Sequence, residues 1–209
     1  IKSSAVITVR TAQTTAQKDG IKAFDEGKTR DAEFQFTEAI NSEPRIWMRR
    51  KILTMLVRCA LKRNDYLTAG TRFQLLFESD PETAHMNLIP LLWNDDILDG
   101  ETRTVAIAWL QDEKPIARLL AASWLFFDPG HSETAFAVLN ELARTPPERI
   151  RQLASWQRRR LQIRSGDVTD FNLQRWDDAV DNLEPALRPG PTFLLSRGYV
   201  VRQDFEFAA

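Results

Sequence analysis

The sequence has a single cysteine, Cys59, among its 209 residues. One thiol cannot form an internal disulfide, and it cannot supply a cysteine-based zinc site. Cys59 lies on the apolar side of an expected helix, so we interpret it as a buried structural thiol. The two histidines, His85 and His131, are far apart and match no spacing of metal ligands. We therefore expect no bound metal and no cofactor.

Long hydrophobic runs are also absent, because no apolar stretch approaches the ~20 residues that span a bilayer. The 28 basic and 29 acidic residues give a net charge of −1, which predicts no general affinity for nucleic acid or anionic membranes. The first residue is Ile1 and not methionine. This start is compatible with a leader or anchor trimmed before it, so the sequence assigns no compartment.

Glycine and proline are rare inside the long segments, where Leu, Ala, Arg, Glu and Gln predominate. These residues favour helix, so the fold class is all-α. Only residues 4–10, SAVITVR, have an extended pattern. We expect an extended or disordered N-terminal arm over residues 1–11 and one helical domain over residues 12–209.

Residues 16–44 form a unit whose helix-packing positions recur along the chain. Its marker residues are Gly20, Ala23, Gly27, Ala32, Phe36, Ala39 and Pro44. Small residues let two antiparallel helices approach, Phe36 fills the gap between them, and Pro44 ends the second helix. The same offsets, an alanine followed four positions later by a large apolar residue and then by proline, occur in residues 64–81, 132–147 and 175–191.

The repeated unit resembles the tetratricopeptide repeat family over about residues 12–209. The resemblance implies an α–α superhelix of about five and a half antiparallel helix hairpins. The expected units are about 12–44, 45–81, 82–115, 116–147 and 148–191, with a partial unit at 192–209. The third unit is placed by spacing alone, with helices over about 82–93 and 101–111, and residues 164–172 are expected to form an inserted loop.

Two parts of this repeat pattern leave alternatives open. Residues 110–125 also resemble HEAT-type repeats, so the geometry of residues 82–130 stays undecided between the two families. The last unit places Leu195 and Tyr199 at repeat positions but stops near the start of its second helix. A missing helix exposes apolar surface, which predicts a longer natural chain or a partner, including another copy of this chain, at that end.

No catalytic motif occurs, because the chain has no GxSxG, GxGxxG or P-loop sequence. The acidic residues 93–101, WNDDILDGE, lack a calcium ligand at Ile97, and Ala106 stands where a bidentate glutamate is required. We interpret them as a loop between helices. The sequence thus predicts no catalytic residue and no small-molecule substrate.

The resemblance places a binding surface on the first helix of each hairpin, where such domains hold extended peptides. Lys51, Met55, Arg58 and Lys62 share one helical face by their spacing alone. The other units contribute candidate groove residues: Gln17, Ile21, Phe24, Met86, Trp93, Leu120, Trp124, Phe127, Arg151 and Arg158. Such a surface suits an extended acidic segment with an apolar anchor. The alternative is that these cations only keep an exposed face soluble.

Two neighbouring segments carry opposite charge. Residues 144–164 hold seven arginines against one glutamate, and residues 167–184 hold six acids against one arginine. The resemblance makes these segments the two helices of one hairpin. We therefore expect much of the arginine charge to be neutralised within the repeat, which weakens a nucleic-acid interpretation.

The function that the sequence predicts is a non-catalytic scaffold that binds a protein or peptide partner. Three alternatives stay open: a structural subunit that assembles through its open ends, single-stranded nucleic-acid binding through the basic and aromatic groove, and a scaffold arm of a larger enzyme.

Overall fold

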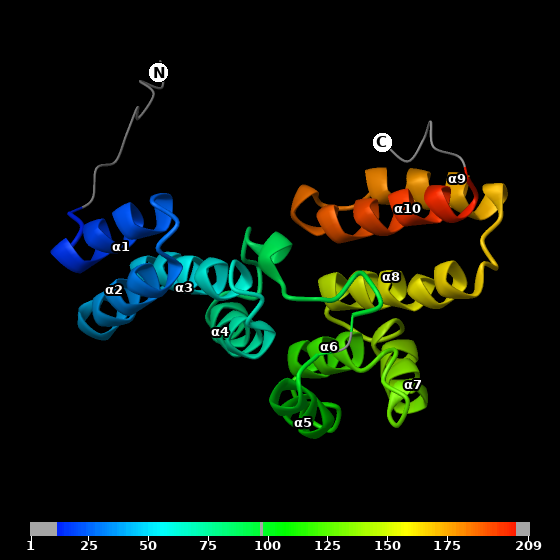
Figure 1. The fold of residues 1–209 in the computed structure, drawn as a ribbon, viewed down its shortest axis with the longest axis horizontal. Helices are drawn as coiled ribbons and strands as arrows, with labels where there is room; N and C mark the ends of the chain where they lie inside the picture. The colour runs from blue at the N-terminus through cyan, green and yellow to red at the C-terminus, as the bar shows by residue number, and fades with distance from the viewer. Residues whose placement is uncertain (1–11, 97, 204–209) are drawn as a thin grey trace, which may run out of the picture.

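The computed structural model describes residues 12–96 and 98–203, so the expected arm at residues 1–11 lies outside the described residues. Within them every regular element is a helix (Figure 1), as the sequence predicts. The α-helices are α1 Thr15–Asp25, α2 Thr29–Ser42, α3 Ile46–Leu61, α4 Tyr66–Ser79, α5 Gly100–Trp109, α6 Pro115–Trp124, α7 Ser132–Leu142, α8 Glu148–Ser165, α9 Asp170–Asp181 and α10 Pro189–Val201, with the 3₁₀ helices η1 Met86–Leu88 and η2 Pro185–Leu187.

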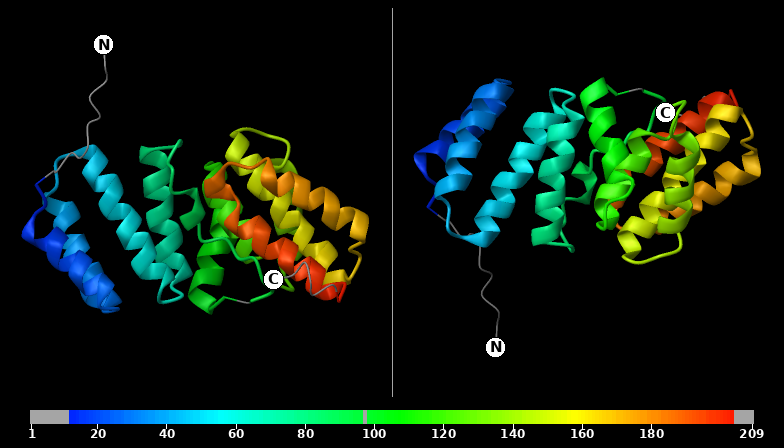
Figure 2. Two further views of the ribbon diagram at one scale, coloured as in Figure 1. Left: turned by 90° about the horizontal axis from the view of Figure 1, so that it is seen from above. Right: turned by 90° about the horizontal axis from the view of Figure 1, so that it is seen from below.

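The first four helices form two hairpins with short connections. Thr14 begins α1 with a capping box, in which its hydroxyl accepts from the Gln17 backbone and the Gln17 side chain accepts from the Thr14 backbone. Gly27 lies in the turn before α2 with a φ of 77°, a conformation that disfavours other residues. The helices follow one another from α1 and α2 at one end toward α9 and α10 at the other (Figure 2), and α10 packs against both α8 and α9.

The residues at the repeat offsets pack between the helices, as predicted. Phe36 is 2% exposed, and a Cβ atom at Gly20 would lie 2.9 Å from its ring, so glycine permits the close approach of α1 and α2. The corresponding residues of the other three matching segments are also buried or half-buried: Ala69, Phe73, Leu76, Ala135, Leu139, Leu142, Trp176, Ala179 and Leu183. The two core clusters meet at Leu53, which packs against both.

The predicted helix over residues 82–93 is wrong. Only η1 forms there, and the described residues between η1 and α5 have no regular structure; the bounds of α5 agree with the second predicted helix. Pro90 has no N–H to donate and disfavours a helix through its neighbours. The polar backbone atoms of this stretch instead bond to side chains from later helices.

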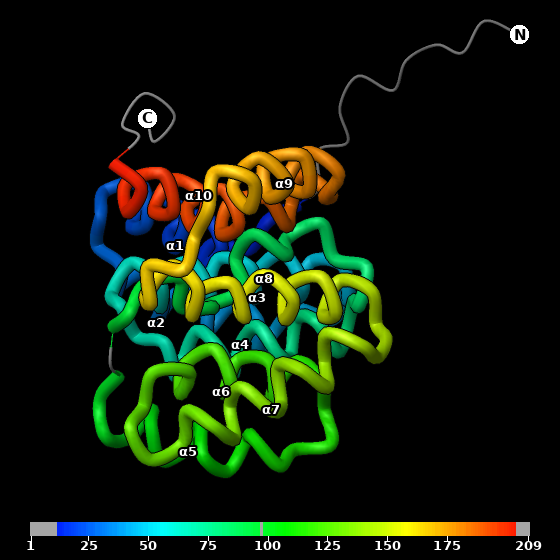
Figure 3. The backbone as a smooth tube through the Cα atoms, turned by 90° about the vertical axis from the view of Figure 1, so that its right-hand side faces the viewer, coloured from blue at the N-terminus to red at the C-terminus, as the bar shows by residue number. Residues whose placement is uncertain are grey.

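The C-terminal helices differ from the predicted units in their boundaries. The expected loop at 164–172 is shorter, because α8 continues to Ser165 and ends at Gly166 with a φ of 75°. Pro191 does not terminate the preceding helix but lies in the first turn of α10. Seen from this end of the molecule, α8 lies between α7 on one side and α9 and α10 on the other (Figure 3). Among the described helices, none combines the length and apolar character needed to cross a membrane.

Candidate partner-binding surface

Helices α1 and α3 lie side by side and run in the same direction. Near their N-terminal ends, Gln17 Nε2 donates to Glu43 Oε2 at 3.0 Å. Near their C-terminal ends, Lys62 Nζ lies 4.2 Å from the centre of the Phe24 ring. Between these points the two helices present a shared outer face, which we call the N-terminal groove. Its residues are Ile21, Phe24, Lys51, Met55, Arg58 and Lys62.

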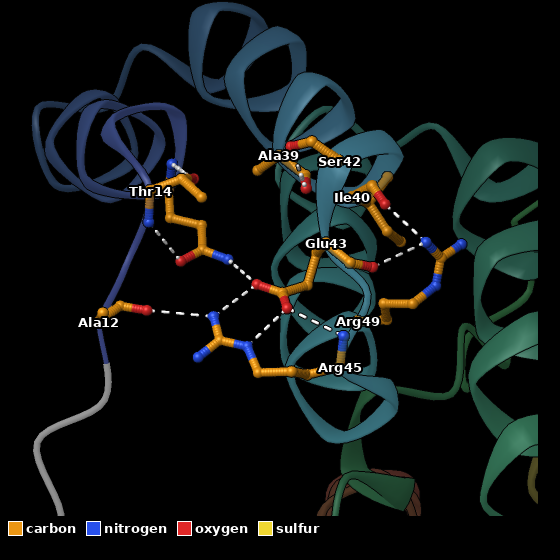
Figure 4. A network of polar contacts seen from close by, with 9 residues as sticks. Ala12, Thr14, Ala39, Ile40, Ser42, Glu43, Arg45 and Arg49 are labelled. Carbon is orange, nitrogen blue, oxygen red and sulfur yellow. Dashed lines mark hydrogen bonds and ion pairs between the residues drawn. The ribbon is translucent and has the colours of Figure 1, made fainter.

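A buried carboxylate fixes the start of this groove. Glu43, 2% exposed, accepts from Arg45 Nε at 2.6 Å and also from Gln17 (Figure 4). Arg45 in turn donates to the backbone oxygen of Ala12 at 3.1 Å. The bonds from Arg45, and then that from Gln17, lower the pKa of Glu43 to about 2. This network joins the beginning of α1 to the connection between α2 and α3.

The floor of the groove has a small apolar hollow of about 60 Å³. Met48 and Ile52 are buried beneath it, whereas Ile21 and Met55 remain partly exposed at its rim. Lys51 stands beside it on α3. A hollow of this size holds one or two methyl groups, which suits the tip of a single apolar side chain.

On α3, the cations outside the groove bond to oxygen acceptors of the chain: Arg49 to the backbone oxygens of Ile40 and Glu43, and Arg50 to a carboxylate. Arg50 on the packing side pairs with Asp80 at 3.8 Å, and Arg63 and Arg72 both pair with Glu33. In contrast, the three groove cations form no ion pair with any described residue: Lys51, Arg58 and Lys62. Arg58 only approaches Met55 Sδ, at 3.8 Å. The groove therefore holds positive charge that no described residue neutralises through an ion pair.

In the C-terminal half, the surface between α6, α8 and α10 is filled by the chain's own residues 90–94. Trp124 Nε1 donates to the Pro90 oxygen at 2.7 Å, and Gln157 Nε2 donates to the Leu92 oxygen at 3.0 Å. Arg197 on α10 donates to the Trp93 oxygen at 2.9 Å. Side chains of three helices thus bind the backbone of a non-helical segment, which leaves little of this surface for a partner.

Arg160 is the most deeply buried cation of this arrangement, at 1% exposure. It donates to the Ser123 oxygen at 2.9 Å, to Gln157 Oε1 at 2.7 Å and to the Asn94 oxygen. Burial lowers its pKa to about 9, and no described carboxylate forms an ion pair with it. Neutral acceptors therefore stabilise this cation, and it connects α6, α8 and residues 90–94.

Several predicted groove residues are not on the surface. Trp124 is 4% exposed, and three further candidate groove residues are buried in the same way: Gln17, Met86 and Leu120. Trp124 on α6 is covered by the segment at Pro90, to whose oxygen its ring nitrogen donates, whereas Gln17 on α1 donates to the buried Glu43 carboxylate. Trp93 is half-buried against α10 at Gly190, and the half-buried Phe127 ring lies 4.4 Å from the Arg164 guanidinium. Among the described residues, the groove that the sequence places across all units is thus exposed along α1 and α3 and covered at α6.

The expected neutralisation of the arginines in residues 144–164 is wrong for most of them. Arg149 pairs with Glu184 at 2.7 Å, and Arg151 pairs with Glu148 of its own helix. None of the other five forms an ion pair with a described residue. Of the two predicted site residues here, Arg151 is exposed and Arg158 is half-buried on the side of α8 away from residues 90–94.

The nearest approach to a catalytic pair is Asp128 with His131. Asp128 accepts from Arg103 Nε at 2.6 Å and contacts His131 Nδ1 at 2.8 Å, and these bonds, the Arg103 bond foremost, hold its pKa well below the usual range. No hydroxyl or thiol among the described residues is bonded to His131. The cluster ties α5 to the start of α7. Elsewhere in the described part of the chain, no group of three His, Cys, Asp or Glu is placed to hold a metal ion.

Sequence reasoning missed Ser123, Gln157, Arg159 and Arg160. Polar residues inside an apolar helical pattern, such as Ser123 in LLAASWLFF, are the signal for a buried hydrogen bond.

Comparisons with known protein families, with curated proteins and with solved structures find no match to this chain.

Proposed function

We propose that this protein is a non-catalytic, tetratricopeptide-like superhelix that binds an extended acidic segment of a partner protein in the N-terminal groove. The observation that carries the proposal is that the groove cations have no oxygen acceptor among the described residues, whereas Arg49 and Arg50 on the other faces of α3 have one. Its packing-side cation Arg50 has a carboxylate partner, whereas Lys51, Arg58 and Lys62 on the groove face have none. Cations without a carboxylate partner among the described residues favour the binding of an anionic segment from another protein.

The hollow beside these cations supports an apolar anchor within the bound segment. Ile21 and Met55 line it with partly exposed side chains, and methionine adapts its shape to different apolar partners. The cations lie on both sides of Met55 along α3. An apolar side chain flanked by acidic residues therefore complements the groove in charge and in shape.

The contacts of residues 90–94 support an extended ligand. In the C-terminal half, helix side chains bind a non-helical backbone through its carbonyl oxygens. Lys51, Arg58 and Lys62 are also long donors, so they can contact the backbone as well as the carboxylates of a bound segment.

A binding titration tests the proposal. A labelled peptide of Asp and Glu with one central leucine is expected to bind the wild-type chain. Reversing the groove charges with Lys51→Glu, Arg58→Glu and Lys62→Glu should weaken binding at least about tenfold, which corresponds to about 1.4 kcal/mol. Met55→Ala should reduce the preference for leucine over alanine in the peptide.

The matched control reverses three exposed, unpaired cations elsewhere: Lys18→Glu, Arg30→Glu and Arg144→Glu. This variant has the same net charge as the groove variant, so a loss through general electrostatics would appear in both. Equal affinity of the groove variant and the control would contradict the proposal.

Self-assembly is a second candidate because α10 exposes three apolar side chains. Phe193, Val200 and Val201 are 48%, 50% and 43% exposed. A face of this kind favours contact with another helix. Sedimentation over a range of concentrations, with Val200→Ser and Phe193→Ser as the comparison, distinguishes a dimer through α10 from a monomer.

A further inference from the structure

The outer face of α8 carries a second unpaired cationic surface, distant in sequence from the N-terminal groove. Two adjoining hollows, of about 310 and 330 Å³, share Ser155 and Arg159. They extend along α8 from Arg151 to Gln162. Phe136 of α7 borders one side, and Leu183, which follows α9, borders the other. We call this surface the arginine trough.

The trough concentrates charge that the chain does not neutralise. Arg158 and Arg159 line it, and Arg175 on α9 lies one turn before Ala179, which also lines it. None of the three arginines forms an ion pair with a described residue. Asp177 and Asp178 on α9 form no ion pair with a described residue, and Asp170 on the same helix pairs with Arg202.

Aromatic rings hold the arginines in place. The Arg159 guanidinium lies 3.6 Å from the Trp156 ring centre and 5.3 Å from that of Trp176. Arg158 lies 5.9 Å from the Phe136 ring centre. Stacking uses the face of a guanidinium and leaves the N–H groups at its edge free to donate. Of these groups, Arg158 Nε and Arg159 Nη1 are buried and have no hydrogen-bond acceptor in the described structure.

The electrostatics favour a ligand with more than one negative charge. Burial, followed by repulsion from Arg175 and Arg158, lowers the pKa of Arg159 to about 10. Three neighbouring cations are therefore held together at a cost in free energy that an anion would offset. One carboxylate brings a single negative charge, whereas a phosphate monoester brings about −1.5 to −2 at neutral pH and three acceptor oxygens.

We propose that the arginine trough binds a phosphorylated side chain in a segment of a partner protein. Arg158 and Arg159 donate to the phosphate oxygens, with Arg175 at the rim and the Ser155 hydroxyl as a further donor. Along α8 the trough is roughly 16 Å long at 1.5 Å per residue, which matches about five residues of extended chain. This length exceeds that of a free phosphate ion and therefore favours a peptide as the carrier of the phosphate.

Fluorescence polarisation with labelled peptides tests the proposal. The probes are a pentapeptide with central phosphoserine flanked by alanines, and its serine and glutamate counterparts. The phosphoserine peptide should bind at least about tenfold more tightly than either counterpart. Arg158→Gln combined with Arg159→Gln should abolish that advantage, and the exposed Arg175→Gln alone should weaken binding at least about threefold.

The control is Lys18→Gln combined with Arg30→Gln, which removes two exposed cations elsewhere and should retain the full advantage. Arg159 packs between tryptophans, so its replacement could disturb the fold, and thermal melting checks that each variant is folded. If the double variant is unfolded, the binding of Arg175→Gln gives the decisive result. Equal binding of the phosphoserine and serine peptides would overturn the proposal. Displacement of the phosphopeptide by inorganic phosphate at the same concentration would also overturn it. The same holds if a single-stranded oligonucleotide binds more tightly than the phosphopeptide and the arginine substitutions abolish that binding.

Discussion

The Ser123 hydroxyl accepts a hydrogen bond from the backbone N–H of Leu92 at 2.9 Å and lies 3.3 Å from the carbonyl oxygen of the same residue, to which it donates. One side chain of α6 therefore satisfies both polar backbone groups of a buried, non-helical residue. A helix or a strand would satisfy these groups through the backbone. Here, side chains from helices later in the chain replace regular structure.

Ser123→Ala tests this arrangement because it removes the hydroxyl and changes little volume. The Leu92 N–H would lose its acceptor in a buried site, which costs about 1–3 kcal/mol in the free energy of unfolding. Urea unfolding measures the loss. Ser132→Ala on α7 is the control, since the Ser132 side chain forms no hydrogen bond with a described residue, and equal effects of the two substitutions would contradict the prediction.

Gly70→Ala tests the contact between α4 and α6. An added Cβ would lie 2.6 Å from the Trp124 ring, and Trp124 cannot move freely because its Nε1 donates to the Pro90 oxygen. Alanine gains about 1 kcal/mol of helix propensity, but overpacking of this kind costs about 1–3 kcal/mol. We expect a net loss of stability in urea.

Gly100→Ala is the matched comparison for that prediction. Gly100 begins α5, and a Cβ there would have no neighbour within 4 Å. This substitution should leave the stability unchanged or raise it slightly. If Gly70→Ala were equally neutral, Trp124 would not be fixed as the structure describes.

Local spacing predicts the contact between α1 and α2 well and the long-range contacts poorly. Small residues at Gly20 and Ala32 with Phe36 between them define the α1–α2 contact, because these residues touch within one hairpin. The groove residues of α3 follow from helical periodicity in the same way. Their lack of ion pairs does not follow, because it depends on where Glu33 and Asp80 lie in space.

The third unit shows why the remainder could not be predicted. Residues 82–93 contain as many apolar residues as an amphipathic helix does. However, Leu91 and Leu92 are adjacent and both buried, whereas a helix at the surface buries one face and does not need to bury both of two adjacent residues. Their placement depends on Gln157 and Arg160, more than 60 positions further along the chain. A partner so distant leaves no periodic signal in the local sequence. For the same reason the sequence does not indicate that Trp124 is buried.

The reactivity of Cys59 provides a third prediction. Cys59 is fully buried, and burial, with a smaller contribution from Glu33, raises the pKa of its thiol to about 11 from the usual 9.0. At pH 8 the thiolate fraction is then about a hundredfold lower than in the unfolded chain. A disulfide reagent should therefore react with the folded protein at least about a hundredfold more slowly than with the protein in guanidinium chloride. Similar rates in the two states would contradict a buried, neutral thiol.

Glu43 predicts how stability depends on pH in the acid range. Its folded-state pKa, about 2, lies below the ordinary value of 4.5 because Arg45 and then Gln17 donate to the carboxylate. The unfolded chain therefore binds a proton at a higher pH than the folded chain does. The stabilisation from Glu43 is complete above about pH 5 and is lost progressively as the pH falls from 4.5 toward 2.

Removing the charge with Glu43→Gln should lower the urea midpoint at neutral pH, and the difference from wild type should shrink between about pH 5 and pH 3. Glu38→Gln, at an exposed position on α2 without an ion pair, should show no such trend. A difference between Glu43→Gln and wild type that stays constant over this range would mean that the Glu43 carboxylate does not anchor the start of the groove through its charge.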